Sequence, residues 1–197
     1  TAQHSGMDEL PGGDQGVMAL LVDRNGQARL VRTPVYTPER NTSTVRSELT
    51  ILPSGGANLR VAQELRGPNA GGARSTLEAQ ATRAERIEDN VREHLPGVHV
   101  TSVRTGDLTD VEQAARFEYE ATVPSIGTRQ GPSLLFTAVS PLDLARQYAT
   151  RSHRTLDLIV GVPSTLDETR TIRLPPGATV SELPPPARIE SPFGRLE

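Results

Sequence analysis

The side chains best suited to metal binding are few and widely spaced in this sequence. Its histidines are His4, His94, His99 and His153. Only His94 and His99, in "HLPGVH", are near neighbours, at the expected end of a helix and the start of the next strand. A metal site needs at least three converging ligands held by supporting hydrogen bonds, and no third ligand stands near this pair. His94 suits a helix C-terminus equally well, because positive charge is favoured there. We therefore expect no metal site.

One pair of residues could support acid–base chemistry. His153 and Asp157, in "HRTLD", are spaced so that imidazole and carboxylate could share a hydrogen bond. A catalytic triad would also need an activated serine, and the sequence contains no G-x-S-x-G motif. The chain has no cysteine, which excludes a thiolate nucleophile, a disulfide and a cysteine-bound metal. We expect no catalytic residue here. A hydrolase that uses His153 and Asp157 is a third hypothesis, and an unchanged activity of His153→Ala would end it.

Two glycine-rich stretches, "GGDQG" at 12–16 and "NAGGARS" at 69–75, could approach a phosphate with their backbone. Neither continues into the Gly-Lys-Ser/Thr of a P-loop, and the chain has no lysine. The second stretch would bring amides to a helix N-terminus, which is a general anion site but is more often an ordinary cap. We therefore expect no cofactor.

Neighbouring carboxylates form two pairs, Asp107 with Asp110 and Asp167 with Glu168. Carboxylates of this kind occur in calcium and glycosidase sites. These pairs lack the ordered spacing of oxygen ligands that a known calcium loop has, and nothing marks them as the two carboxylates of a glycosidase. Solvated surface positions explain both pairs better.

The charge of the chain argues against a polyanionic partner. The net charge is −3, and both signs are interspersed along the sequence, so no surface for nucleic acid or for an anionic membrane is indicated. All 21 basic residues are arginine, which high-GC codon usage explains most simply. An arginine-lined site for carboxylate or phosphate would need clustering. No apolar run approaches the roughly 20 residues that span a bilayer, no signal peptide is visible, and we expect no membrane insertion.

The elements that would position a site are mostly short strands. The chain is long enough for one core, or for one domain with an arm, and its 17 glycines and 16 prolines favour a turn-rich β protein. Residues 1–15 are polar and predict an irregular lead-in. Residues 16–33 predict a hairpin with a type I′ turn at Asn25-Gly26. We divide the chain into a lead-in and hairpin, 1–40, and a main domain, 41–197.

The sequence of the main domain predicts a second hairpin and one helix. Residues 42–67 predict the hairpin, with its turn at Pro53-Ser-Gly-Gly56. Residues 75–95 have an apolar stripe typical of an amphipathic helix. Ser75 and Glu78 are spaced as a capping box, and Pro96-Gly97 would end the helix. An ion pair between Glu88 and Arg92 is expected along it.

The remaining chain predicts strands separated by turns. Ala115, Phe117, Tyr119 and Ala121 alternate with charged residues, as in a half-buried antiparallel strand. The further strands expected are 98–105, a central strand at 132–141, 156–164, 165–175, and a proline-bounded pair at 178–183 and 187–190; residues 142–155 are expected to be helical or looped. Turns at 8–12-residue spacing are typical of a sandwich. The predicted fold is therefore mainly β, an antiparallel β-sandwich with one amphipathic helix and an N-terminal hairpin arm.

The last third, from Arg154 to Glu197 with its motifs "LPPG" and "ESPFG", resembles the C-terminal region of bacterial transglutaminase-like proteins. Residues 84–124 are similar to the helix and strands of that region, and Thr1-Ala2 match the end of the family motif Leu-Asp-x-Thr-Ala. The resemblance implies a β-rich domain of unknown function beside a papain-type domain. The catalytic Cys-His-Asp would then lie upstream of Thr1, and the location would be the periplasm or cell envelope.

These observations support two further hypotheses. The first is a non-catalytic accessory module that flanks a transglutaminase-like domain, with the hairpin at 16–33 docked on that domain or on another protein. The second is a stand-alone adhesion or carbohydrate-binding module. Sugar sites usually stack on exposed aromatic rings, which are scarce here, because the chain has six Tyr and Phe residues and we expect Phe117, Tyr119 and Phe136 in the core. Loss of glycan binding in Tyr36→Ala or Tyr148→Ala would favour it.

Overall fold

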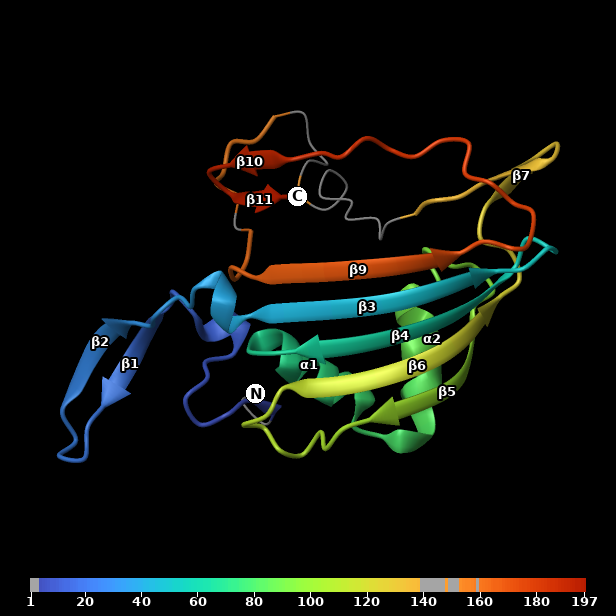
Figure 1. Cartoon of the computed structure of the whole chain (residues 1–197). Coiled ribbons are helices and arrows are strands. Elements are labelled where there is room, and N and C mark those ends of the chain that lie inside the picture. Colours follow the sequence, from blue (N-terminus) through green and yellow to red (C-terminus); the bar gives the residue numbers. More distant parts are fainter. Residues whose placement is uncertain (1–3, 139–147, 149–152, 159) are drawn as a thin grey trace.

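A computed structural model describes residues 4–138, 148, 153–158 and 160–197 of the chain (Figure 1). Its centre is one twisted five-stranded sheet with the strand order β5–β6–β4–β3–β9. The strands are β3 (Thr42–Ile51), β4 (Ala57–Leu65), β5 (His99–Thr105), β6 (Ala115–Val123) and β9 (Thr165–Arg173). The hairpin predicted at 42–67 is confirmed as β3 and β4, and so are the strands at 98–105, 115–124 and 165–175.

The sheet is mixed rather than antiparallel throughout. β3 pairs with β9 in parallel, with Thr42 opposite Thr165 and Thr50 opposite Arg173, whereas the other pairs are antiparallel. The cause lies where the two strands begin. The carbonyl oxygen of Asn41 accepts the Thr165 N–H at 3.0 Å, and the Asn41 side chain donates to the Pro163 carbonyl at 3.2 Å. Because Asn41 fastens the start of β9 beside the start of β3, both strands run the same way.

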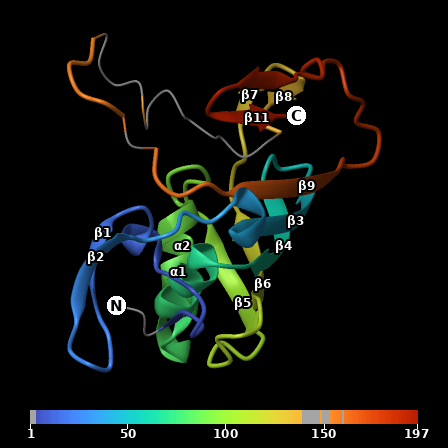
Figure 2. The ribbon, with the colours of Figure 1, turned by 90° about the vertical axis from the view of Figure 1, so that its left-hand side faces the viewer.

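Helices cover one face of this sheet (Figure 2). They are α1 (Pro68–Leu77) and α2 (Arg83–Val91), joined by the 3-10 turn Gln80–Thr82. The core lies between them and the sheet, where Leu77 and Ile87 pack with Leu49, Val61 and Phe117. The mainly β character is confirmed. The finer prediction of an antiparallel sandwich is not, because helices rather than a second large sheet cover this face in the part of the chain that the structure describes.

The expected helix at 75–95 is two helices, and its start was misplaced. α1 begins at Pro68, after Gly67, whose φ of 64° and ψ of −148° are closed to residues with a side chain. The side chain of Asn41, the residue just before β3, accepts the Asn69 N–H at 3.2 Å. Asn41 therefore satisfies the helix N-terminus in place of the predicted cap, Ser75. Ser75 lies inside α1 and caps nothing. The apolar stripe itself is confirmed, since Leu77 and Ile87 are both in the core.

The predicted Glu88–Arg92 ion pair does not form as a direct contact, although, after the larger effect of the Val100 N–H, the charge of Arg92 contributes to lowering the pKa of Glu88. Arg92 pairs with Asp89 at 3.0 Å. Glu88 reaches β5 instead, where its Oε1 accepts the Val100 N–H at 2.7 Å and lies 3.1 Å from His99 Nδ1. A carboxylate that accepts a backbone N–H at the sheet edge gains more than an exposed pair on the same helix.

Small hairpins complete the fold: β1 (Met18–Val22) with β2 (Ala28–Arg32), β7 (Thr128–Gln130) with β8 (Ser133–Leu135), and β10 (Ile189–Ser191) with β11 (Gly194–Leu196). The prediction of a central strand at 132–141 is wrong, because the described part of that range forms only β8, which pairs with β7. Residues 139–141 and most of 142–155 lie outside the described residues. In the described parts of 156–164 and 178–183 there is no strand. Of the proline-bounded pair, only the strand predicted at 187–190 overlaps an observed strand, β10, and β10 pairs with β11 across Pro192-Phe193 rather than with 178–183.

Candidate functional site

The histidines do not converge. His99 lies beside Glu88, and the ring of His4 lies 3.8 Å from Glu78. His94 is exposed just after α2, as a helix C-terminus allows. Within the described residues no group of three histidine, aspartate or glutamate side chains is arranged to hold a metal. Nor is any helix in that part of the chain long and apolar enough to cross a membrane.

The other sequence candidates also lie apart. His153 and Asp157 are both exposed, and no hydrogen bond or ion pair joins them among the described residues. Residues 69–75, expected before a helix, are inside α1. Asp107 closes a local turn by accepting from the Thr109 hydroxyl and N–H, which keeps the pKa of its carboxyl below the usual value. Glu168 pairs with Arg170 at 3.0 Å.

The face of the sheet that the helices leave uncovered carries several arginine–carboxylate ion pairs. The pairs cross from strand to strand: Arg60 to Glu120 at 2.9 Å, Arg116 to Glu64 at 2.9 Å, and Arg173 to Glu48 at 2.7 Å. The hydrogen bond from Arg173 lowers the pKa of Glu48, and that from Arg116 lowers the pKa of Glu64. Two shallow hollows of about 280 and 390 Å³ lie over this face. Because the carboxylates of these pairs are held by arginines, they are not free to act as an acid or a base.

The most unusual surface is the N-terminal hairpin of β1 and β2, which stands out from the body (Figures 1 and 2). We call residues 16–33 the arm. Its exposed fractions are 58% for Met18, 63% for Leu20, 57% for Val22 and 69% for Leu30. Large aliphatic side chains side by side in solvent are uncommon on a monomer and mark an interaction surface.

The loop of the arm differs from the prediction in detail. Asp23 and Gln27 face each other across it, with the Asp23 N–H donating to the Gln27 carbonyl at 3.0 Å. The Asp23 carboxylate accepts the N–H groups of Asn25 and Gln27 at 2.8 and 2.9 Å. Only Gly26 has a positive φ, 78°, whereas a type I′ turn needs two such residues. The hairpin is therefore confirmed, and the turn type was wrong.

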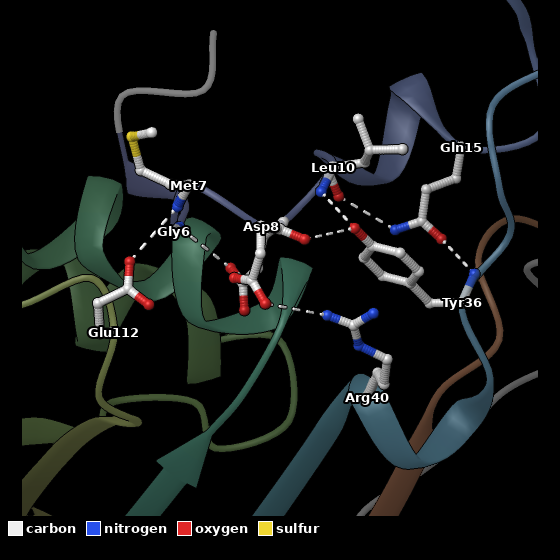
Figure 3. Close-up of polar contacts among 9 residues, drawn as sticks. Gly6, Met7, Asp8, Leu10, Gln15, Tyr36, Arg40 and Glu112 are labelled. Atoms are coloured by element: carbon white, nitrogen blue, oxygen red, sulfur yellow. Dashed lines mark hydrogen bonds and ion pairs between the residues drawn. The ribbon is translucent and has the colours of Figure 1, made fainter.

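The base of the arm is held firmly, as Figure 3 shows. The Tyr36 hydroxyl donates to the Asp8 carbonyl and accepts the Leu10 N–H, both at 2.9 Å. Buried Gln15 accepts the Tyr36 N–H at 3.0 Å and donates to the Leu10 carbonyl at 3.1 Å. Arg40 lies 4.1 Å above the Tyr36 ring. Tyr36 is thus engaged on its hydroxyl and on one face of its ring.

Arg74 fastens the lead-in to the main domain. This side chain is 2% exposed, and its guanidinium donates to the carbonyls of His4 at 3.1 Å, Asp110 at 3.2 Å, and Gln113. The sequence reasoning missed Arg74, because an arginine inside "GGARS" carries no sign of burial. It also left Tyr36 as a possible sugar platform, although a lone aromatic residue in a polar linker is a usable signal of an anchoring role.

Comparison of the chain with models of protein families, with curated proteins and with solved structures gave no match. The site must therefore be read from its own chemistry, and the arm is the feature of the described residues with the clearest functional character.

Proposed function

We propose that this chain is a non-catalytic accessory module that docks, through its arm, on an adjoining transglutaminase-like domain of the cell envelope. The single observation that carries the proposal is the aliphatic surface of the arm. The kind of adjoining domain and the compartment come from the sequence resemblance. The described residues present no cluster of groups poised to react, which fits a supporting role.

The sequence of β1 favours a covered strand. The run "VMALLV" at 17–22 is apolar on both faces, and such runs are typical of strands that are buried on both sides. In this chain the run is largely exposed. A two-stranded hairpin is also at best marginally stable in water unless a further layer packs on it. Burial against a second protein surface would resolve both features.

The division of the chain fits this role. The lead-in is fastened to the main domain by Arg74, and the arm begins only after Gln15. We therefore take residues 16–33 as the docking element and 41–197 as the domain that presents it. The proposal needs no reactive group in either part.

The alternative of a carbohydrate-binding or adhesion module has less support. Phe117 and Tyr119 are buried, and Arg40 covers one face of Tyr36. The Tyr148 hydroxyl donates to the Val160 carbonyl at 3.1 Å. Phe193, on the terminal hairpin, is 85% exposed, but these residues together do not form a platform of several exposed rings.

A binding titration tests the proposal. The probe is the transglutaminase-like domain of the same gene, purified as a separate polypeptide, and the observable is heat of binding to the intact chain. We expect saturable binding with one site. A gene that encodes no such domain, or a domain that fails to bind, would refute the proposed function.

A further inference from the structure

We infer that the arm docks by one defined face on an apolar protein surface rimmed by carboxylates. This docking face consists of Met18, Leu20, Val22, Ala28 and Leu30. The inference rests on the proposed function and adds to it which side of the arm is used and what chemistry the adjoining domain must offer.

The two faces of the arm differ. In the pairing of β1 with β2, Leu20 lies opposite Leu30 and Val22 opposite Ala28, so that aliphatic side chains adjoin across the docking face. On the other face the cross-strand pairs are Ala19 with Val31, both half-buried, and Leu21 with Arg29. The docking face is therefore both the more apolar and the more exposed.

Three arginines of the arm lack partners. In the part of the chain that the structure describes, Arg24, Arg29 and Arg32 form no hydrogen bond or ion pair through their guanidinium groups. The arm contains only one acidic residue, Asp23, although the whole chain has a net charge of −3. On the outer sheet face, by contrast, arginines such as Arg60 are matched by carboxylates. Charge complementarity thus calls for carboxylates on the partner.

The position of the polar residues at the tip of the arm favours a protein over a lipid bilayer as the docking partner. The tip of the arm, Asp23 to Gln27, is entirely polar and exposed, and the aliphatic side chains lie along its flank. Insertion of the tip into a bilayer would bury that polar loop together with the unpaired edges of both strands, which hydrocarbon cannot satisfy. Side-on packing against a protein leaves the tip in water.

A second copy of the chain is a poorer occupant. In a two-fold symmetric contact between two arms the same patch meets itself. Arg32 lies opposite Met18 at the end of the docking face, so each copy would bring an unpaired arginine to the contact. Nothing on the arm supplies enough carboxylates to neutralise the arginines of both copies.

The arm is also held ready for docking. At its base the Gly16 N–H donates to the Thr33 carbonyl at 3.2 Å, and the Thr33 N–H donates to the Val17 carbonyl at 2.9 Å. The Thr33 hydroxyl donates to the Asp14 carbonyl at 2.6 Å. A fixed base reduces the entropy lost on binding.

The test measures binding of the intact chain to the gene's transglutaminase-like domain for matched variants. Leu20→Asp with Leu30→Asp disrupts the docking face, and Leu21→Asp places the same charge on the opposite face as a control. Arg24→Glu with Arg29→Glu and Arg32→Glu reverses the charge and leaves the aliphatic face intact. Thermal unfolding of each variant verifies that the main domain is folded. Binding to vesicles with and without anionic lipid tests a membrane as the alternative partner. Sedimentation of the chain alone tests a second copy of the chain.

We expect the docking-face variant to weaken binding by at least ~10-fold, because it would bury unpaired carboxylates in an apolar contact, and Leu21→Asp to change it far less. The charge-reversed variant should bind more weakly and lose its salt dependence. Wild-type binding that survives the docking-face substitutions overturns this inference and leaves the proposed function standing. Arm-dependent binding to vesicles, or arm-dependent self-association with no binding to the domain, overturns both.

Discussion

Arg74 is the residue on which the joint between lead-in and main domain depends. It is a buried cation whose partners are backbone carbonyls from two separate segments, the lead-in at His4 and the β5–β6 connection at Asp110 and Gln113. Its Nε is the buried side-chain polar atom without a hydrogen-bond partner among the described residues. Such an arrangement tolerates little change, because the buried Arg74 side chain supplies the donors that join the lead-in to the β5–β6 connection.

Replacing Arg74 therefore gives the first prediction. Arg74→Met preserves the aliphatic part of the side chain but removes the donors, and we expect it to lower the free energy of unfolding by about 3 kcal/mol. Arg46→Met is the control, since Arg46 is exposed, and should stay within about 0.5 kcal/mol of the wild type. Urea denaturation measures both. Equal stabilities for the two variants would show that Arg74 is not a structural anchor.

Glu88 gives a second prediction, on pH. The Val100 N–H, and then His99, hold the pKa of the Glu88 carboxyl below its usual value of 4.5. A carboxyl whose pKa is lowered by folding stabilises the protein above the pKa of the unfolded state, and that stabilisation is lost as the pH falls through the folded-state pKa.

We therefore expect Glu88→Gln to destabilise the chain by about 1 kcal/mol at neutral pH, and the difference from wild type to vanish in acid. Exposed Glu85 on the same helix serves as the control, and Glu85→Gln should have little effect at either pH. Thermal unfolding across the acidic range measures this. A Glu88→Gln deficit that is constant with pH would contradict the account.

At the scale of elements, several strands were predicted correctly from the local sequence. Buried and exposed residues alternate along most of β6 and over Ala57–Val61 of β4, and the turn between β3 and β4 is made of Pro, Ser and Gly. Local sequence carries that information. The parallel pairing of β9 depends instead on Asn41, more than a hundred residues earlier, and no local pattern contains it.

The helical region also combines a feature set by local sequence with one set by distant residues. The apolar stripe that contains Leu77 and Ile87 is a local property and was predicted, but the start of α1 is fixed by Gly67 and Asn41. Two glycines in this region therefore have opposite roles. At Gly67 a Cβ would lie against the backbone of Arg40, whereas at Gly72, inside α1, a Cβ would meet nothing.

A matched pair of substitutions tests this reading. Gly67→Ala should destabilise the chain by more than about 2 kcal/mol, because φ is positive and the backbone of Arg40 blocks the side chain. Gly72→Ala should stabilise it by roughly 0.5–1 kcal/mol through helix propensity. Denaturant midpoints measure both. A stabilising Gly67→Ala would mean that α1 begins elsewhere.

At the scale of the whole molecule, the sequence predicted a hairpin in the right place but could not predict its exposure. An apolar run such as 17–22 has the pattern of a buried strand, and which surface buries it depends on contacts outside the run. The pairing of arginines with carboxylates across the outer sheet face was not predicted, because the residues that pair there are far apart in the sequence.

The most direct measurement replaces residues 18–32 with a two-glycine turn, since Val17 and Thr33 are already hydrogen-bonded at the base of the arm. Thermal unfolding and binding to the transglutaminase-like domain that we propose as the partner are then compared with those of the intact chain. We predict that the main domain unfolds within a few degrees of the wild type, because the arm contributes little to its core, and that binding is lost. Binding at the wild-type affinity without the arm would contradict the account.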